Sequence, residues 1–126
     1  MIKGIGIDIS DKRRIESSVS RLGDQFLTRI LTPREIEEMP QGTRRISYVA
    51  GRFATKEAFA KATGWGIGER LSWQDMTITS DEWGKPVLLL SEKWLETYDP
   101  QHRMRFHISI SHEKDYAVAQ AIIEEI

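Results

Sequence analysis

Residues 51–68 read Gly-Arg-Phe-Ala-Thr-Lys-Glu-Ala-Phe-Ala-Lys-Ala-Thr-Gly-Trp-Gly-Ile-Gly, a pattern typical of the second half of a long helix and a glycine-rich end. Alanine recurs at every fourth residue, at Ala50, Ala54, Ala58 and Ala62. These alanines form a ridge with almost no side chain, along which a neighbouring element can approach the helix axis closely. We therefore expect this helix to be buried at the centre of the fold.

Four charged residues on the same turns conflict with burial, namely Arg52, Lys56, Glu57 and Lys61. Charged side chains are rarely buried unless they are paired or bind a ligand. Glu57 and Lys61 are one turn apart, so the ordinary interpretation is a surface ion pair worth about 0.2–0.5 kcal/mol. The alternative is a carboxylate that holds a divalent metal ion while the cations hold phosphate.

The composition is that of one modest domain, residues 1–126, in which 40% of the residues are apolar. There is no cysteine, which excludes disulfides and thiolate metal sites and fits a reducing compartment. The first residues resemble neither a signal peptide nor a membrane span. We therefore expect a cytoplasmic protein with neither a membrane nor a nucleic acid as partner.

Basic residues are concentrated in the first half of the chain. Residues 1–61 carry 12 Lys and Arg against 8 Asp and Glu, and the remainder carries 6 against 11. The basic half suggests an acidic partner or a phosphate ligand. Arg14 and Arg21 are seven residues apart on one expected helix, and Arg29 follows them. They form either a solvated face or a docking surface for an acidic protein.

The amino terminus predicts a buried strand, in which glycines separate Ile2, Ile5, Ile7 and Ile9. Asp8 is unusual there because aspartate is disfavoured inside strands. Ser10 or Asp11 then caps a helix. The expected inward positions of that helix are Ile15, Val19 and Leu22.

Residues 32–35, Thr-Pro-Arg-Glu, form a capping box with proline at the first helical position, which predicts a short helix. The long helix should begin near Thr43 or Arg44. Strands are expected at 76–79 and 86–90, joined by a turn with glycine, and a short helix should start at Ser91. The chain should close with strands over 105–112 and 116–123. These elements predict an antiparallel sheet and helices, an α+β fold.

Two segments remain ambiguous in function. Gly64-Trp65-Gly66 follows a helix rather than a strand, so Gly64 is foremost a left-handed helix cap, although such a loop lets backbone approach a ligand. His107 and Ser109 share the polar face of a strand, which is common in a half-exposed sheet. His107 and His112 are separated by an odd offset and point apart, so we reject a zinc site.

Three blocks together resemble the holo-acyl-carrier-protein synthases of the 4′-phosphopantetheinyl transferase superfamily. They are residues 4–9 with Arg14-Ile15 beyond them, residues 52–62, and residues 108–112 before Tyr116-Ala117. The resemblance covers essentially the whole chain. It implies the phosphopantetheinyl transferase fold, in which an antiparallel sheet packs against a long central helix.

The resemblance also implies a cytoplasmic enzyme of fatty acid biosynthesis. Such an enzyme moves the phosphopantetheine arm of coenzyme A onto a serine of apo acyl carrier protein and releases adenosine 3′,5′-bisphosphate. In the family Mg²⁺ is held at the positions of Asp8 and Glu57, and a hard ion with one or two carboxylates and a diphosphate fits that chemistry. We expect Asp8, Glu57 and Lys61 to be catalytic. Lys61 would neutralise or protonate the leaving phosphate, and Glu57 would act as base through a metal-bound water.

Further contacts follow from the same resemblance. The candidates for binding coenzyme A are Arg52, Lys56, Lys61, Gly64, Gly66, His107 and Ser109. Apo acyl carrier protein would dock on Arg14, Arg21 and Arg29, and short members of the family are homotrimers with active sites between subunits. Trp65 and the long segment 91–103 depart from the family pattern. The alternatives are a non-catalytic module that binds carrier protein or nucleotide, and a Mg²⁺-dependent phosphodiesterase.

Overall fold

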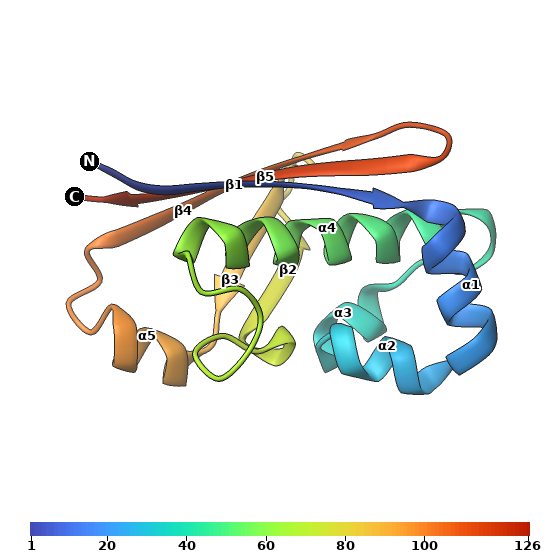
Figure 1. Cartoon of the computed structure of the whole chain (residues 1–126), viewed down its shortest axis with the longest axis horizontal. Helices are drawn as coiled ribbons and strands as arrows, with labels where there is room; N and C mark the ends of the chain where they lie inside the picture. The colour runs from blue at the N-terminus through green and yellow to red at the C-terminus, as the bar shows by residue number, and fades with distance from the viewer.

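In the computed structural model, which describes residues 1–126, helix α4 (Arg45–Thr63) packs against one face of an antiparallel sheet (Figure 1). The strands of that sheet lie in the order β1-β5-β4, and β2 pairs with β3 in a separate two-stranded sheet. The elements in chain order are β1 (Ile2–Asp11), α1 (Lys12–Leu22), α2 (Asp24–Ile30), α3 (Pro33–Glu38), η1 (Gly42–Arg44), α4, η2 (Trp73–Asp75), β2 (Met76–Ser80), β3 (Pro86–Leu90), α5 (Glu92–Tyr98), β4 (Met104–His112) and β5 (Tyr116–Glu125). The predicted α+β class is confirmed.

Helix α4 lies unusually close to β1. A Cβ atom added to Gly6 would lie 1.9 Å from the carbonyl oxygen of Ala58, and one added to Gly4 would lie 1.9 Å from that of Ala62. The predicted alanine ridge is confirmed, since Ala50, Ala54 and Ala58 are completely buried. Glycine on the strand and alanine on the helix therefore let the two backbones come into contact.

The isoleucines of β1 point away from α4, so the prediction of a strand with buried isoleucines is wrong. Ile5, Ile7 and Ile9 are 60%, 60% and 62% exposed. Successive side chains alternate between the faces of a strand, and the inner face belongs to the glycines because only they fit against the helix. The isoleucines consequently lie on the outer face of the sheet.

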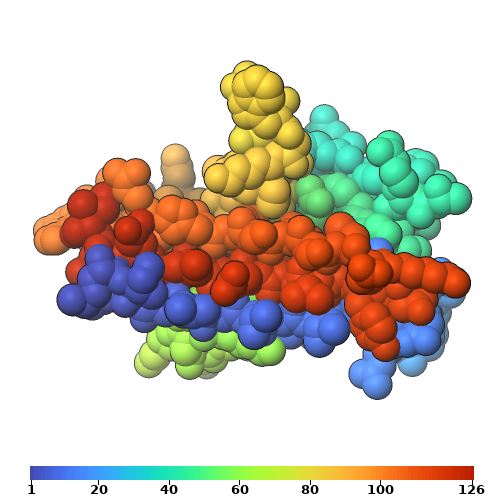
Figure 2. Space-filling view, turned by 90° about the horizontal axis from the view of Figure 1, so that it is seen from above, coloured from blue at the N-terminus to red at the C-terminus, as the bar shows by residue number.

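The outer face continues across the neighbouring strands, which run side by side in Figure 2. Ile5 pairs with Ile122 and Ile9 pairs with Val118 on β5, and paired residues point to the same face. The β2–β3 hairpin, yellow in Figure 2, extends past one edge of this sheet. Along β1 this face is consequently an exposed apolar strip in the single chain.

The helical segment before α4 follows the capping pattern of the sequence. Asp11 caps α1 by accepting a hydrogen bond from the Arg13 amide at 2.9 Å. The capping box of α3 is present, with the Thr32 amide donating to Glu35 Oε1 at 2.8 Å. Ile15 and Val19 are buried as predicted. Leu22 is 42% exposed, contrary to expectation, because it is the last residue of α1.

The later elements match their predictions within a few residues. Both hairpin strands, the short helix after Ser91 and the two closing strands are present. A 3-10 turn at residues 42–44 precedes α4, close to the predicted start. None of the helices combines the length and the apolar character that crossing a membrane requires.

We expect Gly6→Ala to lower the free energy of unfolding by at least about 3 kcal/mol, because the new methyl group would overlap a backbone carbonyl that cannot move away alone. Urea denaturation monitored by circular dichroism would measure the loss. Gly68→Ala is the matched control: its Cβ would meet nothing within 4 Å, so we expect a change within about 1 kcal/mol. Equal effects of the two substitutions would contradict the close approach as the cause.

Candidate functional site

Asp8 and Lys61 meet between β1 and α4. Lys61 Nζ lies 3.0 Å from Asp8 Oδ1 and donates a second hydrogen bond to the carbonyl of Ile7 at 3.1 Å. The Asp8 side chain is 16% exposed and that of Lys61 is 55% exposed. Lys61 forms no ion pair with Glu57, so the interpretation of these two residues as a surface pair along the helix is wrong. The lysine reaches across to the strand instead.

Glu57 lies on α4 one turn before Lys61, and the charges of both Asp8 and Lys61 act on its carboxylate. Partial burial raises the pKa of Glu57, the negative charge of Asp8 raises it further, and Lys61 opposes the shift. Asp8 from the strand and Glu57 from the helix are therefore close enough to repel each other when both are ionised. A cation between them would relieve that repulsion.

The donor set fits Mg²⁺ that is shared with a substrate. The chain has no cluster of three or more histidine, aspartate or glutamate side chains that could form a complete metal cage. Two carboxylates at the junction of β1 and α4 fit an ion that takes its remaining ligands from phosphate and water. The placement of Asp8 and Glu57 as Mg²⁺ ligands stays a prediction.

The environment of the Lys56 side chain contradicts the prediction that it binds coenzyme A. Its side chain is completely buried, and Nζ donates to Glu35 Oε1 at 2.6 Å and to the carbonyls of Ile30 at 2.7 Å and Trp73 at 3.1 Å. All three N–H groups of the ammonium are therefore used inside the protein. Burial lowers the pKa of Lys56, and the carboxylate of Glu35 opposes that shift. No donor is left for a phosphate.

Arg52 lies on the opposite side of α4 from Glu57. Residues five apart on an α-helix are separated by about 140° around its axis. The Arg52 guanidinium lies 3.8 Å from the centre of the Tyr48 ring, and Nη2 is 3.5 Å from the carbonyl of Ile78 on β2. Within one chain, Arg52 and the carboxylates therefore do not form a single site.

A cationic cluster surrounds Arg52, and the sequence analysis missed most of it. The buried Nε atoms of Arg45 and Arg52 have no hydrogen-bond partner. The His112 ring lies against Gly51, where an added Cβ would be 3.1 Å from His112 Cε1. The unpartnered Nε of Arg52, with the positive charges of Lys12 and Arg52 near His112, is suited to an anion, and the carboxylate of Glu38 supplies opposing charge near Arg52. Only the arginine spacing along the helix could have indicated this cluster, because His112 is distant in sequence.

His107 and Ser109 lie on the outer face of the sheet, with the sheet between them and α4. Both are exposed, and His107 Nε2 is 3.0 Å from Glu124 Oε1. The predicted split of β4 into a polar and an apolar face is confirmed, since Ile108 is buried. Within one chain, the structure does not bring His107 or Ser109 to Asp8 and Glu57.

The loop after α4 has the predicted helix cap. Gly64 ends the helix with φ of 82° and Gly66 follows with φ of 73°, both in the left-handed region that favours glycine. Trp65 packs against Tyr98 of α5, with ring centres 4.7 Å apart and ring planes tilted by 51°. The loop borders a cavity of about 380 Å³ that also includes Glu69 and Arg70. Trp65 is thus packed against α5, while the glycines of the loop border the cavity.

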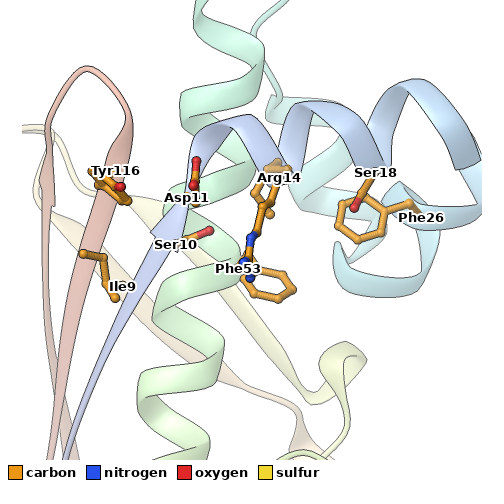
Figure 3. Close-up of a pocket in the computed structure, with 9 residues that line it drawn as sticks. Ile9, Ser10, Asp11, Arg14, Ser18, Phe26, Phe53 and Tyr116 are labelled. Carbon is orange, nitrogen blue, oxygen red and sulfur yellow. The ribbon is translucent and has the colours of Figure 1, made fainter.

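Arg14 borders a cavity of about 440 Å³ (Figure 3). Its lining comes from β1, α1, α2, α4 and β5 and consists of Ile9, Ser10, Asp11, Arg14, Ile15, Ser18, Phe26, Phe53 and Tyr116. In Figure 3, Arg14 extends from α1 toward α4, where Phe53 lies. Arg21 in the last turn of α1 and Arg29 in the last turn of α2 are exposed. A basic rim and an apolar interior suit an acidic amphipathic partner.

Comparisons with known proteins agree with one another. The sequence profile of the family described as the 4′-phosphopantetheinyl transferase superfamily matches residues 4–121. A holo-[acyl-carrier-protein] synthase of Geobacillus kaustophilus (strain HTA426) is 50% identical over 129 residues, covering 100% of this chain and 92% of that protein. The crystal structure of holo-[acyl-carrier-protein] synthase from Neisseria meningitidis superposes with a TM-score of 0.89 at 41% identity, over 99% of this chain and 100% of that one. The crystal structure of a holo-(acyl-carrier-protein) synthase from Bacillus anthracis str. Ames, in complex with CoA (3′,5′-ADP), superposes with a TM-score of 0.85 at 42% identity. The match covers 100% of this chain and 99% of that one.

The environment of His112 predicts a dependence of stability on pH. Burial, and then the positive charges of Lys12 and Arg52, lower the pKa of His112 below its ordinary 6.5. The folded protein then binds fewer protons than the unfolded chain just below pH 6.5, so this group's contribution to stability falls as the pH drops through that window. We expect His112→Asn to flatten the change in free energy of unfolding between about pH 7.5 and about pH 5. Urea titrations at several pH values would measure it, and an unchanged slope would contradict the assignment.

Proposed function

Because the chain belongs to the 4′-phosphopantetheinyl transferase superfamily, we propose that it transfers the phosphopantetheine arm of coenzyme A to a serine of apo acyl carrier protein. The observation that carries the proposal is the meeting of Asp8, Glu57 and Lys61 between β1 and α4. The names of the relatives and the CoA complex of the Bacillus anthracis structure support it. The reaction would release adenosine 3′,5′-bisphosphate and serve fatty acid biosynthesis in the cytoplasm.

The residues of the site divide the chemistry among them. Asp8 and Glu57 would hold Mg²⁺, which when bound withdraws charge from the diphosphate. Lys61 is long and exposed enough to turn from Asp8 toward the phosphate that leaves, where its ammonium neutralises the developing charge. Glu57 is the candidate to accept the proton of the serine hydroxyl.

We infer that the coenzyme site is completed between copies of the chain in a homotrimer. Asp8 and Glu57 lie on one side of α4, and the cationic cluster around Arg52 lies on the other. The outer face of the sheet, with Ile5, Ile7 and Ile9, supplies an apolar surface for a second copy. Such packing would also cover the exposed face that carries His107 and Ser109.

The transfer reaction is tested by incubating the protein with coenzyme A, Mg²⁺ and apo acyl carrier protein and weighing the carrier by mass spectrometry. We expect the carrier to gain one phosphopantetheine group. A carrier of unchanged mass together with cleaved coenzyme A would instead indicate a phosphodiesterase. A carrier that binds without gaining mass would indicate a non-catalytic module.

Substitutions in the site should separate metal binding from charge neutralisation. We expect Asp8→Ala and Glu57→Gln each to lower kcat/KM by at least about a hundredfold, because a bound metal ion contributes several kcal/mol to such reactions. Lys61→Ala should lower kcat to a similar extent, about a hundredfold, with little change in the Mg²⁺ concentration for half-maximal rate. Kinetics across a Mg²⁺ series would measure both. Near wild-type transfer by Asp8→Ala at limiting Mg²⁺ would refute the assignment of the ligands.

We further propose that the carrier protein docks over the cavity beside Arg14. The cavity offers aromatic side chains at Phe26 and Phe53 for an apolar contact. Arg14 and Arg21 project from α1, and Arg29 continues the basic surface on α2. Exposed charges of this kind steer association more than they raise affinity.

Reversing Arg14 and Arg21 to Glu should raise the KM for carrier protein about tenfold and flatten its dependence on salt, because steering acts over about 8 Å at physiological ionic strength. The KM for coenzyme A should remain unchanged. Steady-state kinetics across a salt series would measure both constants. If both constants rose equally, these arginines would serve the coenzyme site or the fold.

A further inference from the structure

Two side chains that make no contact with Asp8 or Glu57, those of Lys56 and Gln74, bind the carboxyl end of α2. The last carbonyl groups of a helix have no partner within it. Lys56 Nζ from α4 donates to the carbonyl of Ile30 at 2.7 Å. Gln74 Nε2 from η2 lies within hydrogen-bonding distance of the carbonyl oxygens of Leu31 at 2.9 Å, Thr28 at 3.0 Å and Arg29 at 3.3 Å, which share its two N–H groups. Together these side chains hold the end of α2 from two sides.

The Lys56 side of this clamp is fixed by a buried ion pair. Glu35 of α3 is completely buried, with Oε1 2.6 Å from Lys56 Nζ and Oε2 accepting a hydrogen bond from the Ile78 amide of β2 at 2.9 Å. The Lys56 ammonium also binds the carbonyl of Trp73 at 3.1 Å. Such a pair often adds little net stability, and its best-attested use is to fix one arrangement of the elements it joins.

Both aromatic walls of the docking cavity are linked to the clamp. Phe26 belongs to α2, whose end the clamp holds. Phe53 stacks on Trp73, with ring centres 5.2 Å apart, and Trp73 is the residue whose carbonyl binds Lys56. A change in the clamp would therefore move Phe26, Phe53 or both, and would leave β1 and the far half of α4 in place.

We propose that Lys56 and Gln74 are positioning residues for the carrier protein, because they set the spacing of the Phe26 and Phe53 walls of the cavity beside Arg14. This role rests on the proposed transfer function. It separates two properties of the enzyme: the clamp governs recognition of the carrier, and Asp8, Glu57 and Lys61 govern the chemistry. A loosened clamp should consequently affect the KM for the carrier alone.

The decisive variant is Gln74→Ala, because Gln74 is exposed and its loss leaves no buried charge unpaired. We expect the KM for apo carrier protein to rise about fivefold, with kcat and the KM for coenzyme A unchanged within about twofold. Lys56→Met should raise the carrier KM about tenfold and also destabilise the protein, because Glu35 is left unpaired. Amide hydrogen exchange of Leu27 in α2 and of Leu31, which caps it, should become faster in both variants.

Ile108→Ala is the matched control, since Ile108 is buried on β4, where it packs with residues of α4 and β5 and pairs with no residue of the clamp, so the substitution leaves a cavity elsewhere. It should lower stability and change neither KM. If Gln74→Ala speeds exchange in α2 without changing the carrier KM, the clamp is merely structural and the proposal is overturned. Wild-type protein that transfers nothing would overturn the transfer function and this role together. Exchange in α2 would still show whether the clamp exists.

Discussion

Contact between the backbones of β1 and α4 is the constraint on which the rest of the structure depends. The carbonyl oxygens of Ala62 and Ala58 occupy the space where Gly4 and Gly6 would carry a Cβ. The helix cannot slide or rotate without placing a larger residue against the strand. Asp8 lies two residues beyond Gly6 on the same face of β1, so the contact also brings it within reach of Lys61. The contact between glycines and alanines thereby positions the charged residues Asp8 and Lys61 beside each other.

Much of this fold could be predicted from the sequence, and the misplaced isoleucines show why part could not. The alanine ridge and the capping box are local patterns whose physical meaning does not depend on distant residues. Which side chains of β1 lie on its inner face depends on the element that packs there. Apolar side chains usually point inward, so the isoleucines were expected on that face. Here the helix is so close that the inner face must be glycine. The isoleucines of β1 consequently face outward, where a single chain offers no neighbour.

In the candidate site, too, some features could be predicted from the sequence and others depend on tertiary contacts. A resemblance in sequence paired Asp8 with Glu57, and in the structure Lys61 binds Asp8 while the charge of Asp8 raises the pKa of Glu57. Lys56, next to Glu57 in sequence, points instead into the interior toward Glu35, 21 residues away. Helical spacing predicts which residues share a face, but it cannot predict which face is covered. His112 was missed because only the end of β4 places it beside Gly51 and the arginines.

The contact between Lys61 and Asp8 has a consequence for the order of events in the proposed enzyme. Lys61 donates to Oδ1 of the carboxylate that is assigned to the cation, so the lysine and the cation compete for the negative charge of Asp8. An anion that draws Lys61 away strengthens the affinity of Asp8 for a cation. By thermodynamic reciprocity, a cation at Asp8 frees Lys61 and strengthens the affinity for the anion by the same factor. The lysine therefore couples the two binding events, and each ligand should bind poorly without the other.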